Sequence, residues 1–431
     1  MIGIVVLAVV RLAPSLAPIT LDDALSLAAK RNADLKVARA DEQAAAVDAR
    51  SSYQGVLPRL DLNATADYQN AWSLKASSVE SPSLSPFVAQ GTATLAWTVF
   101  DGLSSWHLIS ASRARQASAA RQLDESTLRV AFEVTRRFYE VVKQQRALQV
   151  RREAAALSQE LVERADALFP AGRGTKADTY NARVNLGNDE IAVRFQATAL
   201  VRARTDLAVV LGLASDAGLE VVPPVTVSGS GLPDLAEPPP LPELLAKALK
   251  ERPSVAAQKL AEQATEFEIA RAEGAYWPVV GLQASFQAQS PSYAASGFDP
   301  YQFVATAGVT LAYNIYAGGE TQAAVERAEV QARRARALLE QADQTVSAEV
   351  TFAREQVVSL AASVATAKEI LDAADKALRF ARDKLEAGVA SQLEVRDATL
   401  KLAQAKLTLV NSVVDLVVAR ADLNRAVGGS L

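Results

Sequence analysis

Polar and apolar residues alternate with a period of two in four short stretches of the chain. Residues 60–68 carry apolar side chains at even positions, and residues 89–99 carry them at odd positions. The same pattern returns at 280–287 and at 305–315. Such alternation predicts four β-strands, each with one apolar and one polar face. It is typical of barrel strands between lipid and water, and also of a soluble hairpin with one wet face.

A very long helix is predicted after each pair of strands. Residues 103–169 and residues 320–387 contain neither glycine nor proline, and each run would span roughly 100 Å as an α-helix. Apolar residues recur at helical spacing in the first run, at Leu123, Val130, Val134, Phe138, Val141 and Leu148. Because a helix of this length needs a packing partner along its whole length, the pattern predicts a coiled-coil assembly.

An internal duplication relates the two halves of the chain. LAWTVFDGL (95–103) aligns with LAYNIYAGG (311–319), and VRARTDLAVVLG (201–212) aligns with VVARADLNRAVG (417–428), both at an offset of 216 residues. VLPRLDL (56–62) aligns with YWPVVGL (276–282) at an offset of 220 residues. We therefore expect a tandem repeat of one unit of about 200 residues, joined by a Pro- and Gly-rich linker at 221–242.

Each half has the same predicted order of elements. A first helix precedes the strand pair, and the long helix reverses near a lone glycine into a return helix. The first helices are predicted at 21–53 and 241–274, the reversals at Gly172 and Gly388, and the return helices at 175–211 and 391–427. Thr20 is a suitable N-cap for the first of these helices.

Composition removes several classes of function. The 431 residues carry a net charge of −4 with no basic cluster, so we expect no nucleic-acid partner. There is no cysteine and only one histidine, His107, which leaves no thiolate or histidine-rich metal site and no Ser–His or Cys–His nucleophile. We predict no catalytic residues, no metal and no cofactor. An enzyme is thus the weakest of the functional hypotheses.

The N-terminal segment has the pattern of a signal peptide. Residues 1–10 form a short apolar stretch, and Ser15 and Ala17 form a cleavage-like pair of small residues, which places a probable signal peptide at 1–17. A buried strand or helix is the alternative. With a mean hydropathy of only +0.07, the rest of the chain is expected to contain no membrane-spanning helix.

Four strands are too few to close a barrel within one chain. About eight are needed, and an open sheet with a lipid-facing side would leave its edges unpaired. Several copies that pool their strands would solve this, and three copies would give twelve. The long helices of the same copies would then form a tunnel wall.

This ordered combination resembles the TolC-type outer-membrane efflux protein family, also called outer membrane factors. The resemblance rests on the duplication, the paired hairpins, the long helices and the reversal AGVASQLEVRDA (387–398), and it covers about 19–428. It implies a mainly α protein with transmembrane β-strands. Three copies would form an antiparallel coiled-coil α-barrel in the periplasm, continuous with a twelve-stranded β-barrel in the bacterial outer membrane.

The resemblance also implies a division of the chain and a set of partners. The periplasmic helical and equatorial region would comprise 18–57, 101–220, 243–276 and 317–431, and the barrel hairpins 58–100 and 277–316. Such proteins are passive exit ducts that work with a periplasmic adaptor and an inner-membrane pump of RND, ABC or MFS type. A soluble periplasmic coiled-coil scaffold is the alternative function.

Acidic residues just after the second reversal ring the periplasmic entrance in this family. Counting from Gly388, the matching positions are Glu394 and Asp397, and Asp178 follows the first reversal at the place of Glu394. The resemblance implies that these three residues form a periplasmic gate. The alternative is an acidic first turn that complements the helix dipole.

One part of the family pattern is missing. The family closes its mouth with a Tyr and an Arg near the second reversal, and the matching positions here hold Leu385 and Ala390. Arg173 or Arg396 is the candidate replacement. The reversal tips are expected to contact the adaptor through Ala171, Gly172, Arg173, Ala387, Gly388 and Val389.

Aromatic residues cluster near the ends of the predicted strands. We expect them to anchor the barrel at the membrane interfaces, with packing in the core or loops as the alternative. The candidates are Tyr68, Trp72, Trp97, Phe100, Tyr313 and Tyr316.

Overall fold

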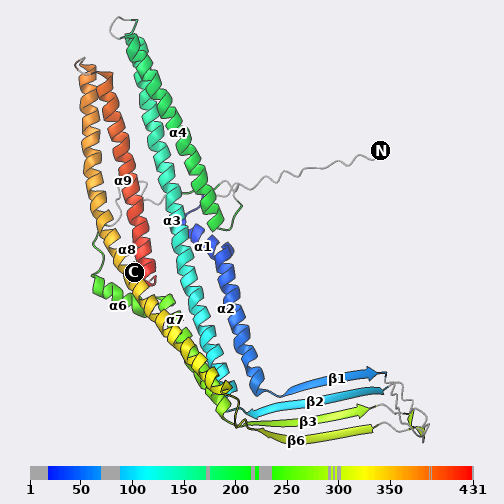
Figure 1. Cartoon of the computed structure of the whole chain (residues 1–431). Coiled ribbons are helices and arrows are strands. Elements are labelled where there is room, and N and C mark those ends of the chain that lie inside the picture. The colour runs from blue at the N-terminus through cyan, green and yellow to red at the C-terminus, as the bar shows by residue number, and fades with distance from the viewer. Residues whose placement is uncertain are drawn as a thin grey trace, which may run out of the picture. The chain divides into compact units, whose positions relative to one another are not determined.

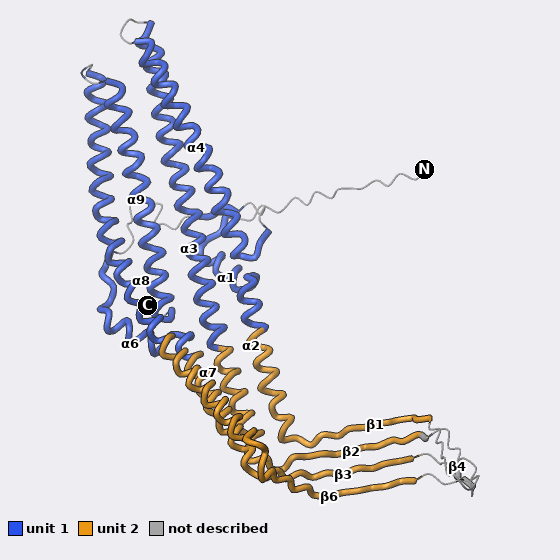
Figure 2. Tube along the Cα trace, in the orientation of Figure 1, with its two compact units in different colours: residues 1–40, 121–256, 342–431 blue, residues 41–120, 257–341 orange. Residues whose placement is uncertain are grey.

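Figure 1 shows the whole chain in a computed structural model. The structure describes residues 18–68, 88–170, 175–214, 219–222, 235–289, 293–294, 297–298, 302–387, 389 and 391–429. The predicted signal peptide therefore lies outside the described residues. The chain divides into two compact units, coloured in Figure 2. Unit 1 comprises 1–40, 121–256 and 342–431, and unit 2 comprises 41–120 and 257–341.

The two long helices and both return helices are confirmed. Helix α3 (Ser104–Leu168) has 65 residues and α8 (Glu320–Glu386) has 67. The return helices are α4 (Lys176–Val210) and α9 (Gln392–Val427). All four agree with the predicted bounds to within one residue at each end. The two long helices contain no glycine or proline, and glycines lie at both reversals.

The prediction of one continuous first helix in each half is wrong. The first half contains α1 (Leu21–Arg31) and α2 (Ala33–Ser51), and the second contains α6 (Leu241–Glu251) and α7 (Pro253–Glu273). At Arg252 the cause is the following proline, which disfavours helical backbone in the residue before it. At Asn32 the side chain accepts from the Leu35 amide and donates 2.8 Å to the Val210 carbonyl.

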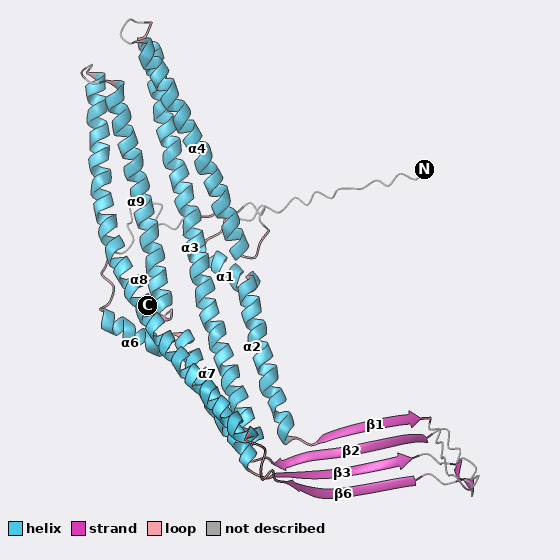
Figure 3. Ribbon diagram, in the orientation of Figure 1, coloured by secondary structure: helices cyan, strands magenta, loops and turns pink. Residues whose placement is uncertain are grey.

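Four of the described strands form one antiparallel sheet in unit 2, in the order β1-β2-β3-β6 (Figure 3). The strands are β1 (Arg59–Asp67), β2 (Val88–Phe100), β3 (Val279–Gln289) and β6 (Gln302–Ala312). Short 3₁₀ turns at Ser52–Val56 and Gly274–Tyr276 precede β1 and β3. A two-residue pair, β4 (Tyr293–Ala294) with β5 (Gly297–Phe298), was not predicted.

The register of the sheet keeps the predicted alternation on common faces. Leu62 lies opposite Ala93, Ala93 opposite Phe286, and Phe286 opposite Ala305, so apolar side chains share one face. The other face carries polar pairs such as Ser285 with Thr306. The outer strands β1 and β6 each pair with one strand only among the described residues.

A single apolar cluster forms the largest core of unit 1. Its fully buried members include Val134, Phe138 and Val141 of α3, which pack with Ala24 and Ala28 of α1 and with Leu207 of α4. A parallel bridge between Ile19 and Val221 lies beside the same cluster. Burying a large aliphatic side chain stabilises a fold by about 1.5–3 kcal/mol, so this cluster accounts for the association of α1, α3 and α4.

A glycine closes each return helix against the end of the first helix of its own half. Gly212 has φ of +68°, and an added Cβ would lie 2.6 Å from the carbonyl oxygen of Arg31. Gly428 has φ of +106°, and its Cβ would lie 3.3 Å from the Glu251 backbone. The contact between the end of the return helix and the end of the first helix, which we call the helix joint, is therefore repeated in both halves. In the first half, only glycine fits at this joint.

A buried arginine links the two repeats. The Arg252 side chain is almost fully buried, and its Nη2 lies 3.2 Å from the Glu125 carboxylate of α3 while Nη1 lies 2.8 Å from the Glu349 carboxylate of α8. Arg252 is the second-half counterpart of Asn32, and both side chains donate to a carbonyl at the end of the return helix. The arginine side chain is longer than that of Asn32, and it also reaches Glu125 in the first half of the chain.

The expectation that no helix is apolar enough to span a membrane is wrong on composition alone. Helix α9 is long and apolar enough to cross a membrane by length and composition. However, 44% of its most apolar stretch is buried inside the fold. Its buried residues include Val395, Leu402 and Leu416, which are expected of a helix packed against neighbours in a coiled coil.

Candidate functional site

The first reversal leads into a tightly capped helix. The Thr175 hydroxyl accepts from the Asp178 amide, and the Asp178 carboxylate accepts from the Thr175 hydroxyl at 2.6 Å and the Thr175 amide at 2.9 Å. These hydrogen bonds hold the pKa of Asp178 below its ordinary value. Asp178 is thus the third-position residue of a capping box. Ala171, Gly172 and Arg173, which make up the predicted tip, lie outside the described residues.

The second reversal carries the two other predicted gate residues. Ser391 caps α9, and the Glu394 carboxylate accepts from Lys384 at 3.0 Å. Asp397 forms an ion pair of 2.6 Å with Lys401, four residues along the same helix. Both carboxylates are exposed, so solvent screens these pairs. Gly388 and Ala390 lie outside the described residues, whereas the Val389 amide donates to the Lys384 carbonyl.

Arg396, a candidate latch residue, is buried and lies between three helices. Its Nη1 lies 2.5 Å from Asp189 Oδ2 of α4, and its Nη2 lies 3.0 Å from Asp189 Oδ1. The Ser158 hydroxyl of α3 accepts from Arg396 at 2.7 Å and donates to Asp189 at 2.6 Å. The two charged side chains are only 9% and 12% exposed. We call Arg396, Asp189 and Ser158 the buried triad.

The buried triad joins the two helical hairpins within one chain. Sequence reasoning missed Asp189 and Ser158, because they lie 207 and 238 residues from Arg396 and no local pattern connects them. Separating the two hairpins here would leave a buried charge without its partner, which costs free energy. The pair therefore holds the hairpins in one relative position. Leu385, at the family's tyrosine position, packs in an apolar cluster with Leu161 instead.

Further ion pairs follow the same boundary between α3 and α9. Lys406 of α9 lies 2.7 Å from Glu153 of α3, and Lys143 of α3 lies 3.2 Å from Asp415 of α9. The hydrogen bond from Lys406 lowers the pKa of Glu153 below its ordinary value. Ion pairs and apolar contacts both join the two hairpins, since Val150 and Ala154 of α3 also pack with Ala403 of α9.

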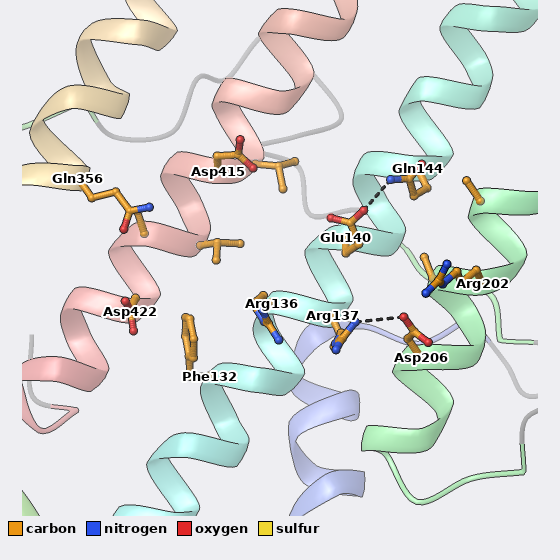
Figure 4. Close-up of a pocket in the computed structure, with 15 residues that line it drawn as sticks. Phe132, Arg136, Arg137, Glu140, Gln144, Arg202, Asp206, Gln356, Asp415 and Asp422 are labelled. Carbon is orange, nitrogen blue, oxygen red and sulfur yellow. Dashed lines mark hydrogen bonds and ion pairs between the residues drawn. The ribbon is translucent and has the colours of Figure 1, made fainter. Parts of the chain in front are cut away.

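A hollow of about 600 Å³ opens between the four long helices of unit 1 (Figure 4). Figure 4 shows Arg137 directed at Asp206 of α4, and Gln144 directed at Glu140. Charges of both signs line it, from Arg136, Arg137, Arg202, Glu140, Asp206, Asp415 and Asp422. Among the described residues, no group of three or more His, Cys, Asp or Glu side chains could hold a metal ion. The lining suits a hydrated surface rather than an apolar ligand.

Sequence comparison now decides the family. The family model for "Outer membrane efflux protein" matches residues 24–213 and 244–429, which are the two halves of the duplication. The chain belongs to the outer membrane efflux protein family. This membership places the chain in the outer membrane as an efflux channel protein, and it removes the alternative of a soluble scaffold.

One curated relative is similar to this chain in sequence, and solved structures share its fold. The outer membrane efflux protein BepC of Brucella suis is 26% identical over 330 residues, which cover 77% of this chain and 70% of BepC. A crystal structure of a membrane protein from Pseudomonas aeruginosa has a TM-score of 0.80 at 21% identity, with 95% of this chain and 93% of that chain covered. VceC of Vibrio cholerae has a TM-score of 0.78 at 18% identity, with coverages of 95% and 96%.

Family membership gives a setting for the aromatic residues at the ends of the sheet. Tyr68, Trp97, Tyr313 and Tyr316 are exposed and Phe100 is half-buried, while Trp72 lies outside the described residues. Sequence reasoning missed Trp106, Tyr276 and Trp277, which are also exposed. Tyr276 and Trp277 directly precede the strand-opening proline Pro278, and that position was the available signal for them.

Proposed function

We propose that three copies of this chain form a passive exit duct that performs no catalysis. The single observation that carries the proposal is the four-stranded sheet with one apolar face, whose outer strands β1 and β6 each pair on one side only among the described residues. Unpaired backbone groups at a sheet edge are costly in lipid, so the sheet must close with other copies. Three copies supply twelve strands, which is enough for a barrel with an open lumen.

Apolar stripes on two helices supply surfaces for this assembly. Tyr180, Val184, Ile191 and Phe195 follow one another along one exposed side of α4. Helix α8 exposes Phe352, Ile370 and Phe380 in the same way. Long exposed apolar stripes are typical of helices that pack against another subunit. We infer that α4 of one copy packs on α8 of the next.

A charge placed in the stripe is expected to break the assembly. Phe195 is 74% exposed in the single chain, and Phe195→Asp would bury a carboxylate between copies. We expect the detergent-purified protein to shift from three copies to one in light scattering. Ala365→Asp adds the same charge at an exposed position of α8 that belongs to neither stripe, and it serves as the control. Trimers of Phe195→Asp as stable as those of the control would contradict the arrangement.

We further propose that the duct receives its substrates from an inner-membrane pump through a periplasmic adaptor. The similar protein BepC is an outer membrane efflux protein. In a periplasmic helical barrel, the reversal tips would be the surface available to a periplasmic partner. Val389 and Leu393 support this, because both are apolar and about three-quarters exposed beside the second reversal. Photo-cross-linking from position 389 to a periplasmic protein in intact cells tests the contact.

Glu394 and Asp397 remain our proposed gate, together with Asp178. Three copies would place six carboxylates of the first pair around the entrance and favour cations there. We expect Glu394→Gln with Asp397→Asn to lower the cation-to-anion permeability ratio in planar bilayers, by roughly a factor of two or more.

The gate prediction has a control on the neighbouring helix. Asp372 pairs with Lys376 at 2.6 Å, four residues along α8, with the same geometry as Asp397 and Lys401. Asp372→Asn therefore removes one similarly paired carboxylate outside the proposed ring. Unchanged ion selectivity in the double variant would leave these acids as first-turn residues that complement the helix dipole.

A further inference from the structure

An open pocket with three aromatic walls lies at the helix-proximal end of the sheet in unit 2. It has a volume of about 440 Å³ and is lined by Tyr276, Trp277, Pro278 and Tyr313. The three rings are 51%, 61% and 59% exposed. None of the described residues that line the pocket is charged. The pocket is separate from the reversal tips and from the hollow in Figure 4.

The pocket continues the apolar face of the sheet. Tyr313 follows Val309 and Leu311 at the same alternation parity along β6, and both of those side chains are about 70% exposed. In an outer-membrane protein this apolar face contacts lipid. The aromatic pocket therefore lies where the lipid-facing surface ends and the helices begin, which is the level of the lipid headgroups.

The other repeat shows what a closed version of this site looks like. The counterparts of Tyr276, Trp277 and Tyr313 are Val56, Leu57 and Trp97. There the Trp97 indole donates 3.0 Å to the Val56 carbonyl, which fixes the ring across the site. Tyr313 has no such bond in the part of the chain that the structure describes. The second repeat thus places three aromatic residues around an open space, whereas the first repeat has Val56 and Leu57 at two of these positions and holds its one aromatic ring by a hydrogen bond.

We propose that this aromatic pocket binds the ammonium group of a phospholipid headgroup from the adjoining membrane leaflet. The faces of Trp and Tyr rings attract ammonium cations, and several rings around one space are the usual recognition device for them. Because no described lining residue is charged, the lipid phosphate would remain in water. Continuity with the lipid-facing sheet selects a lipid over a soluble ammonium compound.

Lipid binding to the purified full-length assembly tests the proposal. Native mass spectrometry would compare phosphatidylethanolamine, phosphatidylcholine and phosphatidylglycerol, of which only the last lacks an ammonium group. We expect the first two to bind about tenfold more tightly than the third. Trp277→Leu keeps apolar bulk and should remove that preference, whereas Trp97→Leu, at the first-repeat counterpart of Tyr313, should retain it.

Each alternative outcome overturns the proposal. Equal binding of the three lipids by the unmodified protein would do so without any variant, even if Trp277→Leu failed to assemble. An unchanged preference in Trp277→Leu or an equal loss in Trp97→Leu would also exclude this pocket as the site. If Trp277→Leu lost its trimers and the unmodified protein showed no lipid preference, the pocket would instead be filled by the next copy.

Discussion

Arg396→Leu is expected to release the tips of the two helical hairpins from each other. The substitution leaves the Asp189 carboxylate buried without its cation, and breaking one partner of a buried pair costs about 3–5 kcal/mol. We expect amide hydrogen exchange around Ser158, Asp189 and Arg396 to accelerate by roughly 10²–10⁴-fold, because a loss of about 3–5 kcal/mol raises the equilibrium constant for local opening by that factor. Single-channel conductance should rise if the triad restrains the periplasmic mouth.

Two variants separate this effect from a general loss of charge. Lys406→Leu removes the neighbouring ion pair with Glu153, which is partly exposed, and should cost less than about 1 kcal/mol. Arg396→Leu combined with Asp189→Leu replaces both charges with apolar groups and should recover much of the lost protection. If Arg396→Leu accelerated exchange no more than Lys406→Leu, the buried triad would not hold the hairpins together.

Gly212→Ala is expected to be the most damaging small substitution at the helix joints. Its left-handed backbone alone would cost about 1–2 kcal/mol with a side chain. The new Cβ would also lie 2.6 Å from the Arg31 carbonyl oxygen, so backbone must move, at a further cost of about 1–3 kcal/mol. Thermal unfolding of the purified protein should show a clearly lowered midpoint.

Two other glycines calibrate this result. Gly318 has φ of +61°, and no heavy atom lies within 4 Å of an added Cβ, so Gly318→Ala measures the backbone cost alone. At Gly428 the nearest backbone atoms lie at 3.3 Å, which predicts an intermediate effect. The expected order of destabilisation is Gly212, then Gly428, then Gly318. Equal shifts at Gly212 and Gly318 would show that the joint relaxes without cost.

Features that depend on local periodicity were predictable from the sequence. The alternation around Leu62 and Phe286 determined which side chains share a face of the sheet, because register can shift only in steps that keep the apolar face together. The long helices were predictable because a run without glycine or proline has nothing to end it. The ion pair between Asp397 and Lys401 was also visible as a spacing of four residues.

Features that depend on distant partners were not predictable in this way. Asn32 looks like a tolerated polar residue within a helix, and its role appears only once Val210 lies beside it, 178 residues away. The buried triad has the same character. The aromatic pocket required the comparison of the two repeats at the level of side chains, since Trp97 and Tyr313 align as similar residues and differ in what they contact.

The open edges of the sheet have a consequence for how the protein reaches its membrane. A chain whose β1 and β6 strands are each paired on one side has no low-energy state in lipid by itself. Membrane insertion and association between copies must therefore occur together, and the rate of insertion should depend steeply on the local concentration of newly exported chains. Expression level would then govern the biogenesis of this channel more strongly than it does for a barrel closed within one chain.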